Sequence, residues 1–258
     1  VDRGGFTRAG AAYVIYGKKT SEGVTWSGLT DDPTMAGRKI LDLGTLKSSD
    51  GFMIQGEAQK GTNDIGSFFG TSVEGLGDIN GDGYADIGIG AAAAEPLNQG
   101  KAYVIFGSAS GQGAKDANDR QVLDAKTMTA SQGFIINGTL GWLGMSVGAA
   151  GDVNGDGWAD FIVSAPFANP AANNAGTSYI IYGRDKGVQF GNLFNNQAVI
   201  NLGSASFGPA EGFSINGRNT GDTLGNVVTA DSSVIAPGDL NNDGIDDLFF
   251  NNLRADRF

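Results

Sequence analysis

The sequence predicts an all-β fold made of repeated four-stranded units, which is the architecture of a β-propeller. A nine-residue pattern, D-x-N-x-D-G-x-x-D, occurs three times, and its copies begin 74 and then 87 residues apart. A short apolar run typical of a buried strand follows each copy. Glycine accounts for 43 of the 258 residues and shows no collagen period, as expected for many short strands joined by tight turns.

The flanks of the nine-residue pattern repeat as well. An aromatic residue or leucine followed by glycine comes before each copy, at 69–70, 143–144 and 224–225. A third strand candidate has the form G-x-x-Y-[VI]-I-[FY]-G, at 10–17, 100–107 and 176–183. A fourth has the form G-F-x-I-x-G, at 51–56, 133–138 and 212–217. Each repeat therefore carries four strand candidates, with the nine-residue loop between the first and the second, which matches a propeller blade.

These repeats predict one domain over residues 1–258, with two full blades and two partial ones. The expected boundaries are a half blade at 1–65, blades at 66–138 and 139–217, and a half blade at 218–258. The polar connections at 18–40, 108–121 and 184–198 are interpreted as surface loops. Short edge strands are expected at 41–43, 122–124 and 200–202, each just before a fourth strand. Packing between neighbouring blades is the expected role of Tyr13, Tyr103 and Tyr179.

The spacing of the nine-residue loop suits a hard cation. Positions 1, 3 and 5 of a tight loop converge, and glycine at position 6 brings the carbonyl of position 7 into the same shell. Calcium accepts six to eight such oxygen ligands. Position 12 is apolar in all copies (Ile89, Val163 and Phe250), which excludes an EF-hand. A metal-free Asx turn is the alternative, and three copies in register argue against it.

Composition excludes several other chemistries. The chain has no cysteine and no histidine, so zinc sites built on them, cysteine nucleophiles and histidine-based triads are ruled out. A net charge of −11 disfavours nucleic acid and anionic membranes as partners. No apolar run approaches the roughly 18 residues of a membrane span. The sequence begins at Val1 without a leader, which suggests a processed chain or a fragment.

The combined motifs resemble the FG-GAP repeat of integrin α-chain β-propellers and of their bacterial, notably cyanobacterial, relatives. The resemblance covers about residues 10 to 253 and is weakest in the third copy, where Leu224-Gly225 replaces Phe-Gly and Asn251-Asn252-Leu253 replaces Gly-Ala-Pro. It implies an integrin-type propeller with three structural Ca²⁺ sites on one face. The implied ligands are the side chains of positions 1, 3, 5 and 9 and the carbonyl of position 7. They are Asp78, Asn80, Asp82, Tyr84 and Asp86; Asp152, Asn154, Asp156, Trp158 and Asp160; and Asp239, Asn241, Asp243, Ile245 and Asp247.

The number of blades leaves two possibilities open. The chain holds strands for about three blades, whereas propellers close with about four to eight and the resembled family has seven. Either the chain is a piece of a longer propeller, or two chains exchange terminal half blades and close a six-bladed ring. An open array would leave bare sheet edges.

The expected function is a calcium-stabilised, non-enzymatic module for extracellular adhesion or for protein or glycan binding, secreted or at a cell surface. Ligands are expected on loops of one face, opposite the metals. The alternatives are an architectural surface-layer or matrix repeat, or a non-catalytic scaffold domain of a secreted hydrolase. Catalysis is not expected, because most clustered acids are assigned to calcium and the others are scattered, at Glu57, Glu74, Glu95 and Glu211. Asp246 and Asn242, at non-ligand positions of the third loop, are expected to face solvent.

Overall fold

The computed structural model describes residues 9–57, 67–94, 99–205, 207–225 and 234–250, which form 18 strands and two three-residue 3-10 helices. The two helices are η1 (Thr20–Glu22) and η2 (Leu43–Thr45). The all-β prediction is confirmed. No helix in this part of the chain has the length and apolar character needed to cross a membrane.

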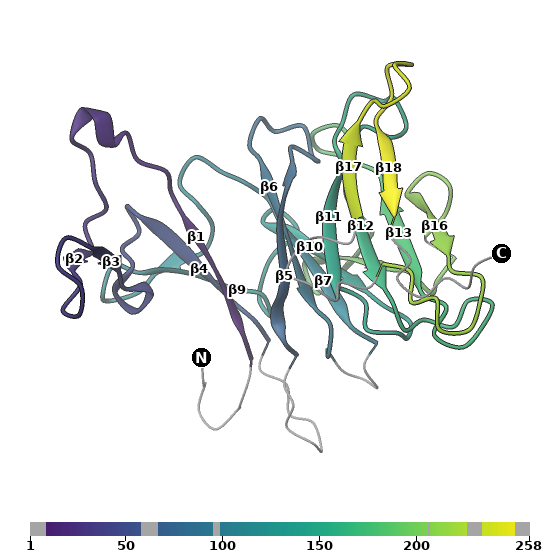
Figure 1. Ribbon diagram of the computed structural model, residues 1–258, viewed down its shortest axis with the longest axis horizontal. Coiled ribbons are helices and arrows are strands. Elements are labelled where there is room, and N and C mark those ends of the chain that lie inside the picture. The colour runs from purple at the N-terminus through teal and green to yellow at the C-terminus, as the bar shows by residue number, and fades with distance from the viewer. Residues whose placement is uncertain (1–8, 58–66, 95–98, 206, 226–233, 251–258) are drawn as a thin grey trace.

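Two four-stranded antiparallel units form the centre of the molecule (Figure 1). In each unit the nine-residue loop joins the first strand to the second, as the sequence predicts. The strands of the first unit are β5 (Phe69–Gly77), β6 (Asp86–Ala91), β7 (Lys101–Ile105) and β10 (Gly133–Asn137). Those of the second unit are β11 (Ser146–Gly151), β12 (Asp160–Ala165), β13 (Thr177–Ile181) and β16 (Gly212–Asn216).

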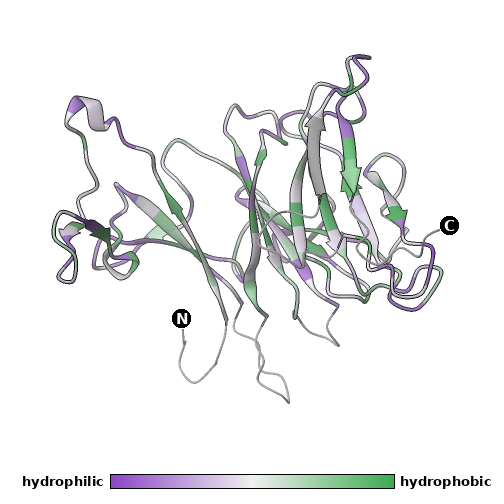
Figure 2. Ribbon diagram, in the orientation of Figure 1, coloured by the Kyte–Doolittle hydropathy of each residue, from purple (hydrophilic) through white to green (hydrophobic). Residues whose placement is uncertain are grey.

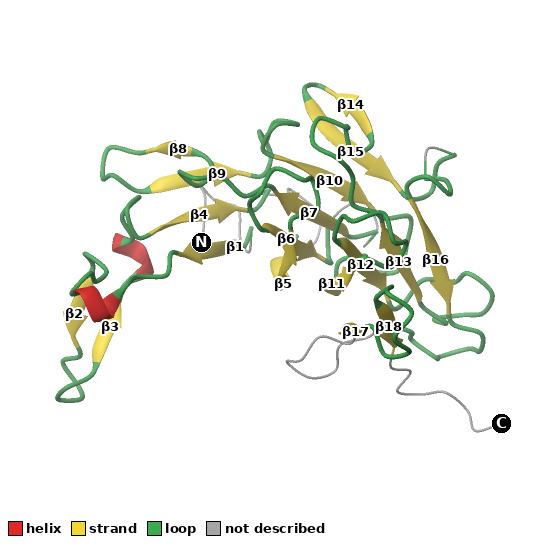
Figure 3. Ribbon diagram, turned by 90° about the horizontal axis from the view of Figure 1, so that it is seen from above, coloured by secondary structure: helices red, strands yellow, loops and turns green. Residues whose placement is uncertain are grey.

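Half units lie on either side of these two. At the N-terminal end, β1 (Ala11–Ile15) pairs antiparallel with β4 (Gly51–Gln55), the third and fourth strands of a blade. At the C-terminal end, β17 (Val234–Gly238) pairs with β18 (Asp247–Phe250), the first and second strands of another. The first strands β5, β11 and β17 pack beside one another in turn. The described sheets therefore follow one another in an open arc and form no closed ring (Figure 3).

Three further hairpins occupy the connections between third and fourth strands. They are β2 (Leu29–Asp31) with β3 (Lys39–Leu41), β8 (Ala114–Lys115) with β9 (Gln121–Asp124), and β14 (Asn192–Phe194) with β15 (Gln197–Asn201). The interpretation of these connections as surface loops is therefore wrong in part. Edge strands do form near the expected positions, but β9 and β15 join the sheet of the preceding blade and not their own. A sequence pattern shows a strand, and only the structure shows which sheet it enters.

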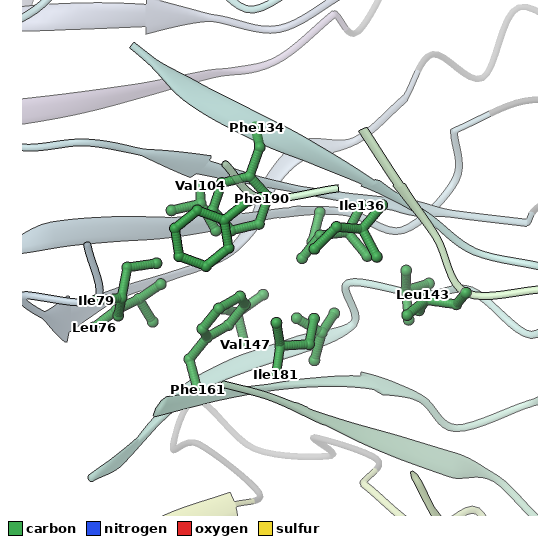
Figure 4. Close-up of a cluster of buried hydrophobic side chains, with 14 of the residues drawn as sticks. Leu76, Ile79, Val104, Phe134, Ile136, Leu143, Val147, Phe161, Ile181 and Phe190 are labelled. Atoms are coloured by element: carbon green, nitrogen blue, oxygen red, sulfur yellow. The ribbon is translucent and has the colours of Figure 1, made fainter. Parts of the chain in front are cut away.

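The main apolar core lies between the two complete units (Figure 4). Phe134 of β10 stacks on Phe190 with ring centroids 4.4 Å apart and faces Phe161 of β12. Both Phe134 and Phe161 are fully buried. Figure 2 shows that apolar residues are concentrated in the strands, whereas the loop that joins β17 to β18 is largely hydrophilic. Burial of such faces between sheets is the main stabilising term of this fold.

A second core joins the N-terminal half unit to the first complete one. Tyr103 is fully buried there, edge-on to Phe69 at 5.1 Å, and its hydroxyl donates to Glu57 at 3.0 Å. The expected packing role is thus confirmed for Tyr103. Burial, together with the charge of Glu57, raises the pKa of Tyr103 well above its ordinary value. The equivalent Tyr13 is only partly buried, because no blade precedes it in the described chain.

Candidate metal loops

All three nine-residue loops sit on one side of the arc, between the first and second strands of their units (Figure 1). Each first strand ends at the glycine just before the loop, and each second strand begins at its ninth residue. These second-strand starts are Asp86, Asp160 and Asp247. Position 9 is therefore fixed by the sheet, whereas positions 1 to 8 form the connection.

The loop side chains fold back over their own backbone in the same way in each copy. In the first loop the two carboxylate oxygens of Asp78 accept from the N–H groups of Asp82 at 3.1 Å and Gly83 at 2.8 Å. Asn80 Oδ1 accepts from Asp82 N at 2.9 Å, and Asp82 Oδ1 accepts from Tyr84 N at 2.9 Å. The second and third loops repeat these four bonds at 2.7–3.1 Å. These bonds hold the oxygens of positions 1, 3 and 5 close to the loop backbone.

In the first two loops, the carboxylate at position 9 bonds to residues both inside and outside its own loop. Asp86 Oδ2 accepts from Ile79 N at 3.0 Å, and its Oδ1 accepts from Gly107 N at 2.8 Å, at the end of the third strand. Asp160 repeats this with Val153 at 2.9 Å and Gly183 at 2.8 Å. One buried carboxylate thus ties the loop to both neighbouring parts of its blade. Asp247 accepts from Leu240 N at 2.7 Å and is only partly buried.

Burial and neighbouring carboxylates shift the titration of position 9. Burial raises the pKa of Asp86 to about 6; hydrogen bonds from Gly107 and Ile79 oppose this, and the charges of Asp82 and Asp78 add to it. The pKa of Asp160 is raised to about 6 by the same causes. At neutral pH each loop therefore concentrates mutually repelling negative charge, which a bound cation would neutralise.

The donor set fits calcium in kind. Three carboxylates, one amide oxygen and a backbone carbonyl per loop are all hard oxygen ligands of the class that Ca²⁺ takes. The carboxylates are turned toward backbone N–H groups, and among the described residues no three acidic side chains form a preassembled metal centre. The loops thus bring each expected ligand into one short connection without completing a coordination shell.

Neighbouring loops also contact each other. A Cβ added at Gly81 would lie 2.7 Å from the Trp158 ring, and one at Gly155 would lie 3.8 Å from Ile245. Position 7 of each later loop therefore packs over position 4 of the loop before it. A side chain at Gly81 would clash with Trp158, which explains why glycine stands there.

A pair of hydrogen bonds links the second loop to the third, contrary to expectation. Asp246, expected to face solvent, instead accepts from Asp152 N at 2.9 Å, and its own N–H donates to the carbonyl of Asp152 at 3.1 Å. The same position holds Ala85 and Ala159 in the other two loops. An aspartate where the other two loops have alanine was the feature of the sequence that could have indicated this contact. Asn242 is exposed with a φ of 61°, in keeping with the expectation for it.

The fold and these loops define a β-sheet repeat with an acidic, metal-type loop between its first and second strands. The FG-GAP repeat family matches residues 69–105 and 143–181, so the chain carries FG-GAP repeats in both complete units. Mouse integrin alpha-IIb is 35% identical over 104 residues, which is 40% of this chain and 9% of that protein. Chicken integrin alpha-6 is 44% identical over 76 residues, 29% of this chain and 6% of that protein.

A third relative is not an integrin. Rat phosphatidylinositol-glycan-specific phospholipase D is 34% identical over 110 residues, 42% of this chain and 10% of that protein. The matches thus span a tenth or less of the length of these relatives. The chain is distantly similar to integrin alpha chains over part of its length.

Proposed function

We propose that this chain is a calcium-stabilised, non-enzymatic binding module that acts in adhesion or in protein or glycan recognition outside the cell. The observation that carries the proposal is the threefold recurrence of the same loop, with equivalent hydrogen bonds and an all-oxygen donor set. The first two copies lie inside the matched FG-GAP repeats. FG-GAP repeats commonly bind calcium, and integrin alpha chains, the relatives in question, are cell-surface proteins.

The metal's role is structural in this proposal. When bound, calcium would supply the positive charge that offsets the repulsion between the loop carboxylates. The chain's own part is to gather the oxygens of positions 1, 3, 5 and 9 and the carbonyl of position 7 in each loop. Because these ligands meet only in the folded state, binding stabilises the fold through mass action.

In this proposal, the ligand binds on the side of the blades opposite the metal loops. A cavity of about 370 Å³ there is lined by apolar and polar groups that include Leu140, Pro170, Tyr179 and Phe207. Leu140 is a large apolar side chain exposed at the rim. Such a mixture suits a protein loop or a sugar face. A matrix or surface-layer repeat would use the same calcium chemistry but would not need a ligand in this cavity.

The proposal assigns no catalytic role to the acidic residues outside the loops. Glu57 accepts from Lys101 and Tyr103, and Glu211 accepts from Gly208 N at 2.9 Å, so both serve local structure. A scaffold domain of a secreted hydrolase remains the second candidate, favoured by the similarity to rat phosphatidylinositol-glycan-specific phospholipase D.

Calorimetric titration with Ca²⁺, combined with thermal unfolding, tests the metal's role. We expect up to three binding events and a melting temperature that rises with calcium. Asp82→Asn, Asp156→Asn and Asp243→Asn should each remove one event, whereas Asp185→Asn, an exposed aspartate outside the loops, should remove none. Full calcium binding by the triple variant would refute the proposal.

A further inference from the structure

Two hairpins of this chain cross from their own blade to the outer edge of the preceding one. Strand β9 pairs in parallel with β4, with Val122 opposite Met53. Strand β15 pairs in parallel with β10, with Val199 opposite Ile135. The two junctions have the same register, because Met53 and Ile135 both stand third in the G-F-x-I-x-G strand.

Each parallel ladder continues past the end of the crossing strand. Ala125 N donates to the carbonyl of Gln55 at 2.9 Å, and Leu202 N donates to the carbonyl of Asn137 at 3.2 Å. The chain then turns, with Thr127 N bonded to the carbonyl of Asp124. Crossing hairpins therefore join successive blades by backbone hydrogen bonds as well as by apolar packing.

The hairpin of β2 and β3 is built in the same way. Thr30 lies opposite Ile40, just as Ala114 lies opposite Val122. The turn that follows is the same too, since Thr45 N bonds to the carbonyl of Asp42 at 3.0 Å. Ile40 is thereby the counterpart of Val122 and Val199. Within the described chain, however, β2 and β3 pair only with each other.

Strand β16 is the matching acceptor. It is the fourth strand of its blade, equivalent to β4 and β10, and among the described strands it pairs only with β13. Phe213 is 39% exposed there, whereas the equivalent Phe52 and Phe134 are 5% and 0% exposed. The residue that follows the hairpin of β2 and β3 is also less buried than its counterpart. Leu43 is 41% exposed, whereas the equivalent Ala125 is fully buried.

The sheet faces at the two ends of the arc also fit each other, because each exposes apolar side chains. On the N-terminal face, Tyr13, Met53 and Val122 line an open cavity of about 320 Å³. Their counterparts in the first complete unit, Tyr103, Ile135 and Val199, are packed against the preceding blade. An apolar layer with no blade in front of it thus stands at one end of the arc, and the exposed Phe213 stands at the other.

One chain cannot bring its own two ends together, because β2 and β3 lie at one extreme of the arc and β16 at the other (Figure 3). We propose that β3 of one copy adds in parallel to the outer edge of β16 of a second copy, so that chains associate head to tail. The two existing junctions fix the register. Ile40 would lie opposite Ser214, Leu41 opposite Ile215, and Asp42 opposite Asn216, with Leu43 N donating to the carbonyl of Asn216.

The same contact completes the C-terminal half unit. Strands β17 and β18 need a third and a fourth strand, and β1 and β4 of the incoming copy are those strands. Gly17 of that copy stands where Gly107 and Gly183 donate to their position-9 carboxylates. It would therefore supply an N–H to the partly buried Asp247. A second copy is thus the occupant that satisfies both the edge of β16 and the half unit at once.

A contact of this kind is heterologous, so it closes into a ring or grows into a filament. Two copies would bring about six blades, within the range in which propellers close. The proposal rests on sheet edges and not on the calcium role, and the two can fail separately. Loss of calcium binding in an intact dimer refutes the latter, and a calcium-saturated monomer refutes the former.

Light scattering on the whole chain, with and without calcium, is the first test. We expect a particle of twice the chain mass in calcium at about 100 µM. Leu43→Pro should weaken association at least about tenfold, because it removes the donating N–H. Proline suits that position in the monomer, since Leu43 opens η2 after the extended N-cap Asp42, with φ −80° and ψ 114°. Leu43→Ala, which keeps the N–H, should have the smaller effect. A wild-type monomer under these conditions would overturn the proposal.

Cross-linking tests the register even if the proline variant fails to fold. The chain has no cysteine, so an introduced pair reports alone. Paired residues on adjacent strands lie about 4.8 Å apart, within the range a disulfide spans. Ile40→Cys with Ser214→Cys should therefore give chain-to-chain disulfides on a non-reducing gel. The control pair, Ile40→Cys with Phe194→Cys, places an exposed cysteine on a different hairpin. Equal cross-linking in both pairs would contradict the proposal.

Discussion

The first two loops and the third carry the same ligand types, yet the structure treats them differently. Asp86 and Asp160 are fully buried and bonded to the ends of their third strands. Asp247 is partly exposed and belongs to a unit that has only its first two strands in the described chain. The same nine-residue pattern of ligand types therefore does not define an identical site. The anchoring of position 9 comes from a strand that the loop itself does not contain.

The largest expected difference concerns stability without calcium. Asp160→Ala should lower the free energy of unfolding by about 3 kcal/mol, because it leaves the buried N–H groups of Val153 and Gly183 without their acceptor. Asp247→Ala should cost about 1 kcal/mol, since its surroundings are more exposed. Urea denaturation in a chelator measures both. Equal costs would show that the third-strand anchor contributes nothing.

The second difference concerns calcium affinity. In the first two loops both carboxylate oxygens of position 9 accept a hydrogen bond before the metal arrives. Asp247 accepts from Leu240 but has no bond from a third strand in the described chain, so its carboxylate is less completely oriented. We expect the third site to bind at least about tenfold more weakly, which corresponds to about 1.4 kcal/mol. Titrations of variants that each retain a single loop would measure the three sites separately. A third site as tight as the others in a monomeric sample would contradict this comparison.

The third difference concerns pH. Aspartate titrates near 3.9 in an unfolded chain, but the pKa values of Asp86 and Asp160 are raised to about 6 in the fold. The folded state therefore binds protons more readily, and ionisation of these groups opposes folding above pH 6. Stability of the calcium-free protein should rise through these groups as the pH falls from 7 toward 4.

Calcium should compete with those same protons. The rise in melting temperature on adding calcium should consequently shrink between pH 7 and 5. A single-loop variant that retains only the third loop provides the control, because Asp247 is only partly buried, whereas Asp86 and Asp160 are fully buried. A calcium effect that grows on acidification would contradict the assignment.

Much of the fold and of the loop chemistry could be predicted from sequence because both are local. The spacing of Asp78, Asn80 and Asp82 and the apolar strand that follows lie within a dozen residues. The four-stranded units followed from repetition of such segments. The crossing of β9 and β15 into the preceding sheet could not be foreseen, because pairing partners far apart in the chain leave no local periodicity. The anchoring role of Gly107 was hidden for the same reason.

The smallest predicted effect concerns a contact that the third loop makes and the first two do not. Asp246 accepts from Asp152 N, a bond that the alanines at the same position of the other loops cannot make. Asp246→Ala should therefore cost about 1 kcal/mol and weaken calcium binding by the second loop as well as the third, because Asp152 is position 1 of the second. Asp185→Ala controls for the loss of one exposed carboxylate. If calorimetry showed only the third site weakened, the bridge would not couple the two loops, and each loop would have to be treated as independent of its neighbour.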